Sequence, residues 1–442
     1  MNVNRRRAAI LTTLGAMLLL LTGLGLLLQH ENARAGFILV ALVQGVVYLL
    51  AVAITWRGGF SRRALIAMLG LAAVMRLGVL FAPPYLSDDI NRYVWDGRVE
   101  AAGINPYRYI PVDPHLAALR DDKIFPNVNR STYAPTIYPP VAEYIFFITT
   151  RVSDSLTWMK ATMLAFEAMT IVLLLRLLMR FELPRERILI YAWHPLLLWE
   201  FAGSGHIDAA VATFVTLALW ARRREADWLT GVAVAAAGLV KFFPAVIFPA
   251  LYRRWDWKMA AAAAAAVLVA YLPVIGVGRA VLGFLPGYAN EEGLENGSGF
   301  FLWSLLKSMA PPIGDLGVLP YLALAGAAVA ALATYIVLSD RAAKHYIGSA
   351  MALAVATTIL LSPHYPWYFA WIVPLLCFAP YPSVLYMTVA SPLLYFVPGG
   401  PDPHGHRMIV DWVIYGPFAV IAGFELWYRR RRGGARFVRV EA

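Results

Sequence analysis

The stretch RRALIAMLGLAAVMRLGVLFAPPYLSDDINRY, residues 62–93, decides the fold class. It begins with two arginines, continues as a mostly apolar run to Pro83 and Pro84, and then presents the paired carboxylates Asp88 and Asp89. A helix of about twenty apolar residues is long enough to cross a bilayer. Similar runs recur along the 442-residue chain, which is 60% hydrophobic and 15% charged, whereas soluble domains carry about 25% charged residues. The sequence therefore predicts an all-α polytopic membrane protein.

Basic residues gather at the ends of these apolar runs and orient them. The clusters lie at residues 5–7, 62–63, 222–224, 253–254 and 429–432. Because Arg and Lys are enriched in cytoplasmic loops, both termini are expected in the cytoplasm and the segment after Pro84 outside it. This pattern explains most of the formal net charge of +11 without a nucleic-acid partner. The single Cys377 excludes a disulfide within the chain.

The hydropathy pattern predicts about 12–14 membrane helices, some of them short or re-entrant. Spans are expected at residues 8–28, 36–56, 63–82, 157–178, 188–203, 206–221, 258–277, 318–338, 344–361, 366–380, 383–398 and 408–428. The first of these lacks a clear cleavage site, so it is interpreted as an uncleaved span rather than a signal peptide.

Residues 228–252 need a separate interpretation, because basic residues flank both ends. About twelve residues are available for each of two legs, against the ~20 of a full span. We predict a hairpin of two short legs with Lys241 near its apex. A deep ammonium is costly without a partner anion, and an anionic ligand such as a phosphate would satisfy it. Snorkelling of the side chain to the interface is the alternative.

The long stretch at residues 83–156 is predicted to be an outer loop. Its segment TIYPPVAEYIFFITTRVSD, residues 136–154, is apolar but too short to cross the bilayer. If it did cross, the arginines after the following span would lie outside, against the positive-inside rule. We therefore expect an interfacial or re-entrant helix that starts at Pro139 and Pro140. Long ordered loops usually carry function.

Polar residues converge on the outer side of this topology. They are Asp88, Asp89, Arg92 and Tyr107 of the outer loop, His206 and Asp208 of the turn GHID, Lys241, then His364, Tyr365 and Tyr368 of SPHYPWYFAW, and Asp402, His404, His406 and Arg407 of the last outer turn. This side of the membrane is therefore expected to carry the chemistry.

Several of these residues have a structural alternative. Asp88 and Asp89 could cap the helix that they begin. His206 and Asp208 could terminate a span, and the aromatic residues after His364 could form an interfacial belt. Asp96 and Arg98 are expected to be structural partners within the loop. The two histidines of the last outer turn are a weak metal signal.

A carboxylate at the lipid–water boundary, together with a deep lysine, suits group transfer from a lipid-linked anionic donor. The carboxylate can take a proton from an acceptor hydroxyl as a general base. The cation can offset charge on a leaving phosphate. The chain has no Walker motif and no dinucleotide-binding fingerprint, which fits a reaction without ATP or a nucleotide sugar.

These motifs resemble the GT-C superfamily of polyprenyl-phosphate-sugar-dependent glycosyltransferases. SDDINRYVWDGRVEAAGINPYRYIP is similar to the first outer loop of that family, and YPPVAEY to the Pro-Pro helix that follows it. GHID, GLVKFFP and SPHYPWYFAWIVPL are similar to later elements of bacterial mannosyltransferases and of the family-87-like branch. The resemblance covers residues 60–400.

The resemblance implies a GT-C-type fold with an extracytoplasmic catalytic loop. It implies Asp89 as general base with Asp88 as partner, and Lys241 with Arg92 at the donor phosphate. From their convergence on the outer side, the residues expected to bind substrate are Tyr107, His206, Asp208, His364, Tyr365 and Tyr368. The expected reaction is inverting transfer of a sugar, mannose first, from a polyprenyl-phosphate donor to a lipid or glycan hydroxyl at the outer face of the bacterial cytoplasmic membrane.

On this interpretation, residues 1–60 are a two-helix extension, 61–400 the catalytic module, and 401–442 a last outer turn, a final helix and a basic cytoplasmic tail. A divalent cation near Asp88 and Asp89 stays open, although the sequence offers no compelling ligand set. A lipid-linked glycan transporter or flippase would need polar residues on both membrane sides, and the cytoplasmic half is apolar. An O-antigen-type polymerase would carry its large loop late in the chain, whereas here it comes early.

Overall fold

The computed structural model describes residues 3–56, 58–396 and 403–431. Every regular element in these ranges is a helix, and no strand occurs among them. The expected all-α fold is confirmed. Asp402, the side chains of His404 and His406, and the tail from residue 432 lie outside what the structure describes.

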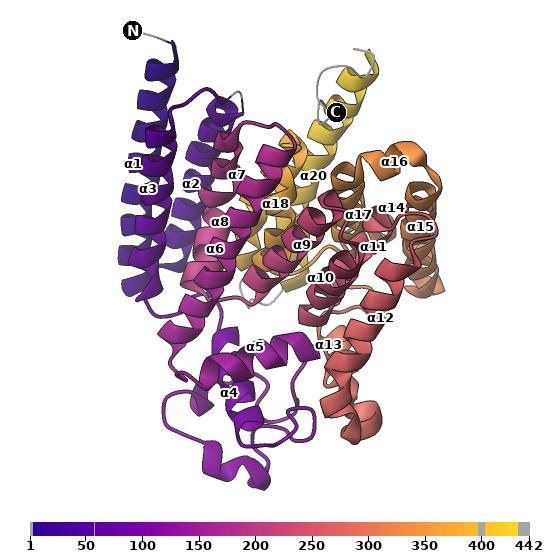
Figure 1. Cartoon of the computed structure of the whole chain (residues 1–442). Helices are drawn as coiled ribbons and strands as arrows, with labels where there is room; N and C mark the ends of the chain where they lie inside the picture. The colour runs from indigo at the N-terminus through magenta and orange to yellow at the C-terminus, as the bar shows by residue number, and fades with distance from the viewer. Residues whose placement is uncertain (1–2, 57, 397–402, 432–442) are drawn as a thin grey trace.

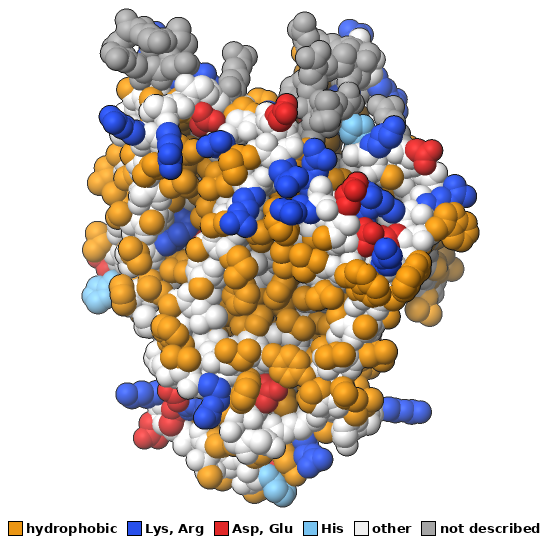
Figure 2. All heavy atoms as spheres, viewed as in Figure 1, with side chains coloured by type: hydrophobic (Ala, Val, Ile, Leu, Met, Phe, Trp, Pro, Cys, Tyr) orange, Lys and Arg blue, Asp and Glu red, His pale blue; other side chains and the backbone are white. Residues whose placement is uncertain are grey.

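Seven helices in the described ranges are long and apolar enough to cross a membrane. They are α1 (Val3–His30), α2 (Arg34–Thr55), α3 (Arg62–Leu80), α6 (Leu156–Arg180), α15 (Leu319–Leu338), α20 (Pro403–Arg431), and a run from α12 (Trp257–Tyr271) through η6 (Leu272–Leu282) into α13 (Leu285–Glu291). Figure 2 shows a broad hydrophobic belt between charged side chains near both ends of the molecule. The belt fits a polytopic membrane protein, as predicted.

Shorter helices fill the space among these spans. They are α7 (Ile188–Ala192), α8 (Pro195–Leu197), the π-helix η4 (Leu198–Gly203), α9 (Asp208–Arg223), α10 (Asp227–Val240), η5 (Phe243–Ile247), α11 (Phe248–Leu251), α14 (Phe301–Met309), η7 (Pro311–Leu316), α16 (Asp340–Lys344), α17 (Tyr346–Leu361), η8 (Pro366–Ile372), α18 (Val373–Leu376), α19 (Pro382–Ala390) and η9 (Ser391–Phe396).

The expectation of a continuous span at residues 188–203 is wrong, because this segment is divided into short helices. The spans expected at residues 366–380 and 383–398 correspond to apolar helices at Pro366–Leu376 and, in the described residues, Pro382–Phe396, each of which changes helix type along its length. Each division or change lies beside an internal proline, Pro195, Pro374 or Pro392. Proline lacks an amide hydrogen and clashes with the preceding turn. Broken helices are tolerated at membrane depth where protein surrounds them, and almost all of these residues are buried.

The outer loop forms a compact layer at one end of the helix bundle. It contains α4 (Asp89–Ala101), the 3-10 helices η1 (Pro114–Leu119) and η2 (Phe125–Asn127), and α5 (Pro140–Thr150). Figure 1 shows α4 and α5 at the end opposite to the one where α1 begins and α20 ends. As predicted, α5 begins at the Pro-Pro pair, and its 11 residues are too few to cross a bilayer.

Close packing of α4 against α5 holds this layer together. Tyr93 stacks on Phe146 with ring centroids 4.5 Å apart. Gly97 permits the approach, since a Cβ added there would lie 2.5 Å from the carbonyl oxygen of Phe146. Because that oxygen belongs to the backbone, a side chain at position 97 requires one helix to move.

Buried polar contacts join α3 and α6, the two helices that precede and follow the outer loop. Arg76 of α3 donates to Glu167 of α6 at 2.6 and 2.7 Å, and both side chains are almost fully buried. Lys160 of α6 donates to the carbonyl oxygens of Val79 and Ala82 at 3.0 and 2.6 Å. The Val79 oxygen also accepts from the amide of Ala82 at 3.1 Å, so the lysine adds a second donor at the C-terminal end of α3. The loop is thus anchored at both ends.

Replacing Gly97 with alanine is expected to destabilise the protein by ~1–3 kcal/mol, since the new methyl group overpacks the α4–α5 contact. Gly70→Ala in α3 is the matched control, because nothing lies within 4 Å of a Cβ added there. In a helix interior alanine is favoured over glycine by about 1 kcal/mol. Thermal unfolding in detergent measures both variants. Equal midpoints would show that the two helices do not depend on this contact.

Candidate active site

The paired carboxylates lie where the outer loop turns into α4. The amide of Asp89 donates to Ser87 Oγ at 3.3 Å. Asp88 occupies the N-cap position, but its side chain makes no capping hydrogen bond. The expectation that this side chain caps the helix is therefore wrong. A competing partner explains the difference, because Asn129 donates to the Asp88 carboxylate instead.

Asn129 ties the two carboxylates together. Its Nδ2 donates to Asp89 Oδ1 at 2.7 Å and to Asp88 Oδ1 at 3.2 Å. Burial raises the pKa of Asp89 above its ordinary value and outweighs the opposing effect of Lys241, while the charge of Asp88 raises this pKa further. The Asp89 side chain is nevertheless 18% exposed, so a substrate can reach it. A reachable carboxylate with a raised pKa suits a general base.

Asp89 lines a polar cavity of about 340 Å³ between the outer loop and the helix bundle. The other lining residues are Leu86, Ser87, Asp88, Asn129, Arg130, Tyr133, Ile137, Tyr138, Lys241, Tyr288, Tyr365, Trp367 and Tyr368. The cavity therefore combines carboxylates, two cations and several aromatic rings. Cations suit a phosphate, and aromatic rings offer large apolar faces with polar edges.

Lys241 reaches this cavity from a break between two helices. α10 ends at Val240, and Lys241 itself is extended, with φ −148° and ψ 139°. The predicted break at Lys241 between two short helical legs is confirmed. Its Nζ donates to Asp208 Oδ2 at 2.6 Å and lies 4.9 Å from the centroid of the Tyr368 ring. Asp208 is thus the anion that a deep lysine requires.

An aromatic wall, made by η8 and the turn before it, forms one side of the cavity. Tyr365 stacks on Trp367 with centroids 4.4 Å apart, and Trp367 stacks on His206 at 4.1 Å. The hydroxyl groups of Tyr368 and Tyr288 are 2.6 Å apart. The wall is therefore bonded to α13, which carries Tyr288.

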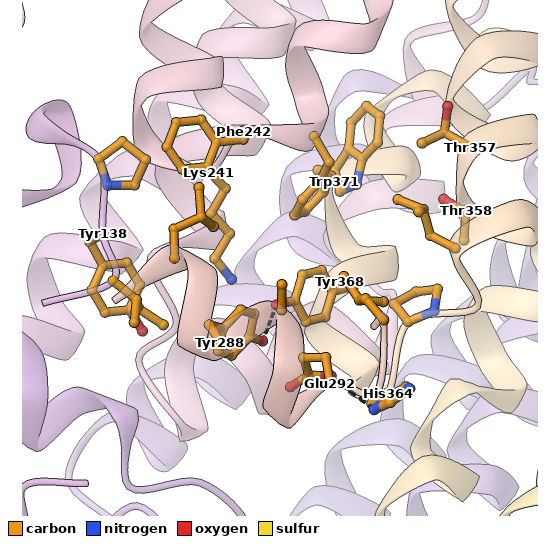
Figure 3. A pocket seen from close by; sticks show the side chains of 18 residues that line it. Tyr138, Lys241, Phe242, Tyr288, Glu292, Thr357, Thr358, His364, Tyr368 and Trp371 are labelled. Atoms are coloured by element: carbon orange, nitrogen blue, oxygen red, sulfur yellow. Dashed lines mark hydrogen bonds and ion pairs between the residues drawn. The ribbon is translucent and has the colours of Figure 1, made fainter. Parts of the chain in front are cut away.

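A second cavity, of about 240 Å³, adjoins the first at Lys241. Both cavities include Ile137, Tyr138, Lys241, Tyr288 and Tyr368. The rest of the second lining is mostly apolar and comprises Pro139, Phe242, Phe243, Leu285, Ala289, Glu292, Leu294, Thr357, Thr358, Leu361, Pro363, His364 and Trp371. Figure 3 shows Lys241 between Tyr138 on one side and Tyr368 on the other.

α13 and the residue after it connect the outer loop to the aromatic wall. Arg130 Nε donates to Glu291 Oε2 at 2.6 Å, and His364 Nδ1 lies 2.8 Å from Glu292 Oε2. Figure 3 shows the second of these contacts and the bond between Tyr288 and Tyr368. Together the three contacts tie three segments to one another around both cavities. The cavities therefore depend on residues that are far apart in the sequence.

The structure brings most of the predicted site residues together. Those that line the polar cavity are Asp88, Asp89, Lys241, Tyr365 and Tyr368. His206 lies 3.9 Å from Asp89, and Asp208 lies 2.6 Å from Lys241. His364 lines the apolar cavity.

Arg92 and Tyr107 are placed differently. Arg92 is 4% exposed and donates to both oxygens of Asp96 at 2.9 Å. Tyr107 is 2% exposed, and its hydroxyl donates to the carbonyl oxygen of Tyr138 at 2.7 Å. Neither side chain lines the polar cavity, so their placement supports a structural role in the loop. Arg98 is also structural, as expected, through Asp121 and Asp154.

Sequence reasoning missed four residues of the site. They are Asn129, Arg130, Glu200 and Tyr288. Asn129 is separated from Asp89 by 40 positions and no local pattern links them. For Tyr288 a signal exists, because it begins the polar cluster YANEE in an otherwise apolar region.

Among the described residues, no group of three or more His, Cys, Asp or Glu side chains is arranged to hold a metal ion. Asp88 and Asp89 alone would leave a hard divalent cation without most of its oxygen ligands.

Removing one partner of the Lys241–Asp208 pair is expected to destabilise the protein by about 3–5 kcal/mol, because the other charge is then buried alone. Asp208 is fully buried and Lys241 is 11% exposed. Asp208→Asn should therefore lower the midpoint of thermal unfolding in detergent more than the double variant with Lys241→Met does. Additive losses in the double variant would contradict this pairing.

The chain matches a known protein family over its N-terminal part. Residues 8–257, more than half of the chain, match the sequence model of a family described as alpha-(1->6)-mannopyranosyltransferase, N-terminal domain. No match is found among curated proteins or among solved structures. The matched part contains Asp88, Asp89, Asn129, Asp208 and Lys241.

Proposed function

We propose that this chain, which belongs to the alpha-(1->6)-mannopyranosyltransferase family, transfers a mannosyl group from a polyprenyl-phosphate donor to a hydroxyl of a lipid or glycan acceptor. One observation carries the proposal: Asp89 and Lys241 line the same polar cavity, and an apolar cavity adjoins it at Lys241. A lipid-linked sugar phosphate has its groups in the matching order, with a polar sugar, an anionic phosphate and an apolar tail.

Asp89 is the general base of the proposed reaction. Its carboxylate takes the proton of the acceptor hydroxyl while the hydroxyl oxygen forms a bond to C1 of the mannosyl group. The bond between C1 and the phosphate oxygen breaks, and its electron pair stays on the phosphate. A single displacement inverts the configuration at C1, so a β-linked donor gives an α-linked product. This outcome agrees with the linkage in the family's description.

Lys241 and Arg130 offset the charge of the leaving phosphate. Both line the polar cavity, and each is held in place by an acid, Asp208 or Glu291. An ammonium has three donors and a guanidinium five, so these ion pairs leave donors for a ligand. Cations fixed in position before the reaction stabilise developing charge better than mobile water does.

The apolar cavity suits the first part of the polyprenyl tail. Its rings and aliphatic side chains include Phe242, Phe243 and Trp371. Burial of apolar surface contributes roughly 0.8 kcal/mol per CH₂ group, so even a short stretch of tail holds the donor. The phosphate at the head of that tail then lies at Lys241.

An open hollow at Asp88 suits the acceptor. It has a volume of about 510 Å³ and shares Leu86, Ser87 and Asp88 with the polar cavity. The remaining lining residues are Pro84, Tyr85, Asn91, Lys123, Asn127 and Leu156. An acceptor arriving here meets the base on the side of the cavity away from the lipid tail. Donor and acceptor groups are thus brought to one base from different directions, as a displacement requires.

We place the site on the extracytoplasmic side of a bacterial cytoplasmic membrane. α3 begins at Arg62, and α20 carries three arginines in its last turn. Figure 1 shows the end of α20 opposite to α4 and α5. Because basic residues favour the cytoplasmic side, the outer loop is expected on the other side.

Asp89→Asn is expected to lower kcat by about 10²–10⁴-fold, because the amide cannot accept the proton of the acceptor hydroxyl. The assay follows transfer of radiolabelled mannose from polyprenyl-phosphate mannose to lipid and glycan acceptors in membranes. Asp122→Asn is the control, since Asp122 is an exposed carboxylate of the same loop. Full activity of Asp89→Asn would exclude it as base. Absence of transfer by the unmodified protein would refute the donor.

A cysteine at position 122 is expected to react with a membrane-impermeant maleimide added outside intact cells. The background carries Cys377→Ala, which removes the single, buried cysteine of the chain. A second cysteine at Arg223, near the cytoplasmic end of α9, should react only after the membrane is permeabilised. The reverse labelling pattern would place the active site in the cytoplasm.

A further inference from the structure

His206 occupies a closed position behind Asp89 that the proposed reaction leaves without a role. Its side chain is 0% exposed, and its ring stacks on Trp367 with an interplanar angle of 21°. Neither ring nitrogen has a hydrogen-bond partner among the described residues. Buried polar atoms without partners are uncommon and often mark functional sites.

The imidazole lies between two carboxylates, one at each ring nitrogen. Nδ1 is 3.9 Å from Asp89 Oδ2, and Nε2 is 3.4 Å from Glu200 Oε2. Glu200 is 2% exposed, and both of its oxygens lie 3.0 Å from the hydroxyl of Tyr395, which donates to it. Glu200, His206 and Asp89 therefore form a row that leads from the buried interior to the polar cavity.

The backbone holds this row against α4. η4, which carries Glu200, is a π-helix, a form that is frequent at functional sites. Gly205 has a φ of +73°, and a Cβ added there would lie 2.6 Å from Ile90 Cδ1. The amide of His206 donates to the carbonyl oxygen of Glu200 at 2.9 Å. The turn before α9 is thus packed directly on the first turn of α4.

A proton shared between His206 and Glu200 leaves Nδ1 as a donor toward Asp89. When Glu200 holds the proton, Nε2 accepts from it and the ring hydrogen is on Nδ1. When the imidazole holds it, both nitrogens carry hydrogen. In both cases an N–H group faces Asp89 Oδ2 across 3.9 Å, and catalytic hydrogen bonds are often long until the substrate is bound.

We propose that His206 is the positioning residue of Asp89, with Nδ1–H donating to Oδ2 and Glu200 fixing that nitrogen as the donor. The inference rests on the proposed function, in which Asp89 is the base. Asn129 holds Oδ1 and His206 holds Oδ2, so both oxygens are oriented. Each oxygen keeps a lone pair for the proton of the acceptor hydroxyl.

Three charged groups act on the imidazole and must be considered in its pH dependence. They are Asp89 from α4, Glu200 from η4, and Lys241 from the break after α10. Asp208 of α9 acts on Glu200 and on Lys241. Lys241 and Asp208 already form an ion pair, and η8 contributes only the ring of Trp367. Because a donor to a carboxylate favours its charged form, loss of His206 raises the pKa of Asp89.

Three substitutions at position 206 distinguish positioning from packing. His206→Phe keeps a ring against Trp367 and removes both nitrogens. His206→Asn places an amide donor near the position of Nδ1, whereas His206→Gln places it near that of Nε2. We expect Phe and Gln to move the acid limb of the kcat/KM profile up by about one pH unit and to lower kcat about tenfold with little change in KM. Asn should keep the original limb.

A second measurement needs no substrate. Infrared titration follows the protonated-carboxyl band that Asp89→Asn removes, and this band should titrate at higher pH in His206→Phe than in the unmodified protein. His194→Phe is the matched control: His194 is equally buried and bonds Thr388 at 3.0 Å, so its loss should affect stability without moving the band.

The outcomes separate this inference from the proposed function. The positioning role would be overturned if, in His206→Phe and His206→Gln, the Asp89 carboxyl band and the acid limb of the kcat/KM profile stay at their original pH, even if transfer is observed. A shifted band in a protein that does not use polyprenyl-phosphate mannose would support the positioning role and refute the donor. If the Phe variant does not fold, the contrast between Asn and Gln decides.

Discussion

A largely buried lysine that ends a helix needs an anion beside it, and the arrangement of the site follows from this constraint. Lys241 bonds Asp208 at 2.6 Å, which joins the break after α10 to the first turn of α9. The same turn places His206 against α4. A buried ammonium without a partner would be far more costly than an irregular backbone. The ion pair therefore fixes the position of the Lys241 ammonium relative to α9. Because the turn before α9 lies against α4, it also fixes the position of Asp89 relative to that ammonium.

Asp89 is held in surroundings that disfavour its charged form, and contacts made by the outer loop oppose this effect. Burial removes water from the Asp89 carboxylate, and the neighbouring charge of Asp88 repels it; both effects raise the pKa of Asp89. Asn129 and Arg130, both from the irregular part of the outer loop, oppose this effect. The loop can hold them in place because α4 and α5 pack closely at Gly97 and because α3 and α6 are bonded below it.

Much of the fold follows from local sequence signals, whereas the completion of the site does not. Hydropathy and arginine clusters locate the long helices, and the Pro-Pro pair starts α5, because these signals act within a few residues. Lys241 is identified for the same reason, since basic residues at both ends leave too little chain for two spans. The partner of Asp88 depends instead on the path of the loop, because Asn129 lies 41 positions after it. The partner of Arg92 is local: Asp96 is its i+4 neighbour in α4 and binds the guanidinium that the resemblance assigns to the phosphate.

The family match ends at residue 257, and residues on both sides of this point contribute to the site. Residues 8–257 contain Asp89, its amide partner Asn129, the His206–Glu200 row and Lys241, which are the groups that the proposed reaction uses. α13 and the aromatic wall lie beyond it, and they supply Tyr288, Tyr365 and Tyr368 to the cavity. These side chains form part of the cavity wall, and the proposed reaction assigns them no step. The walls of the two cavities are therefore completed by residues on both sides of residue 257, where the family match ends.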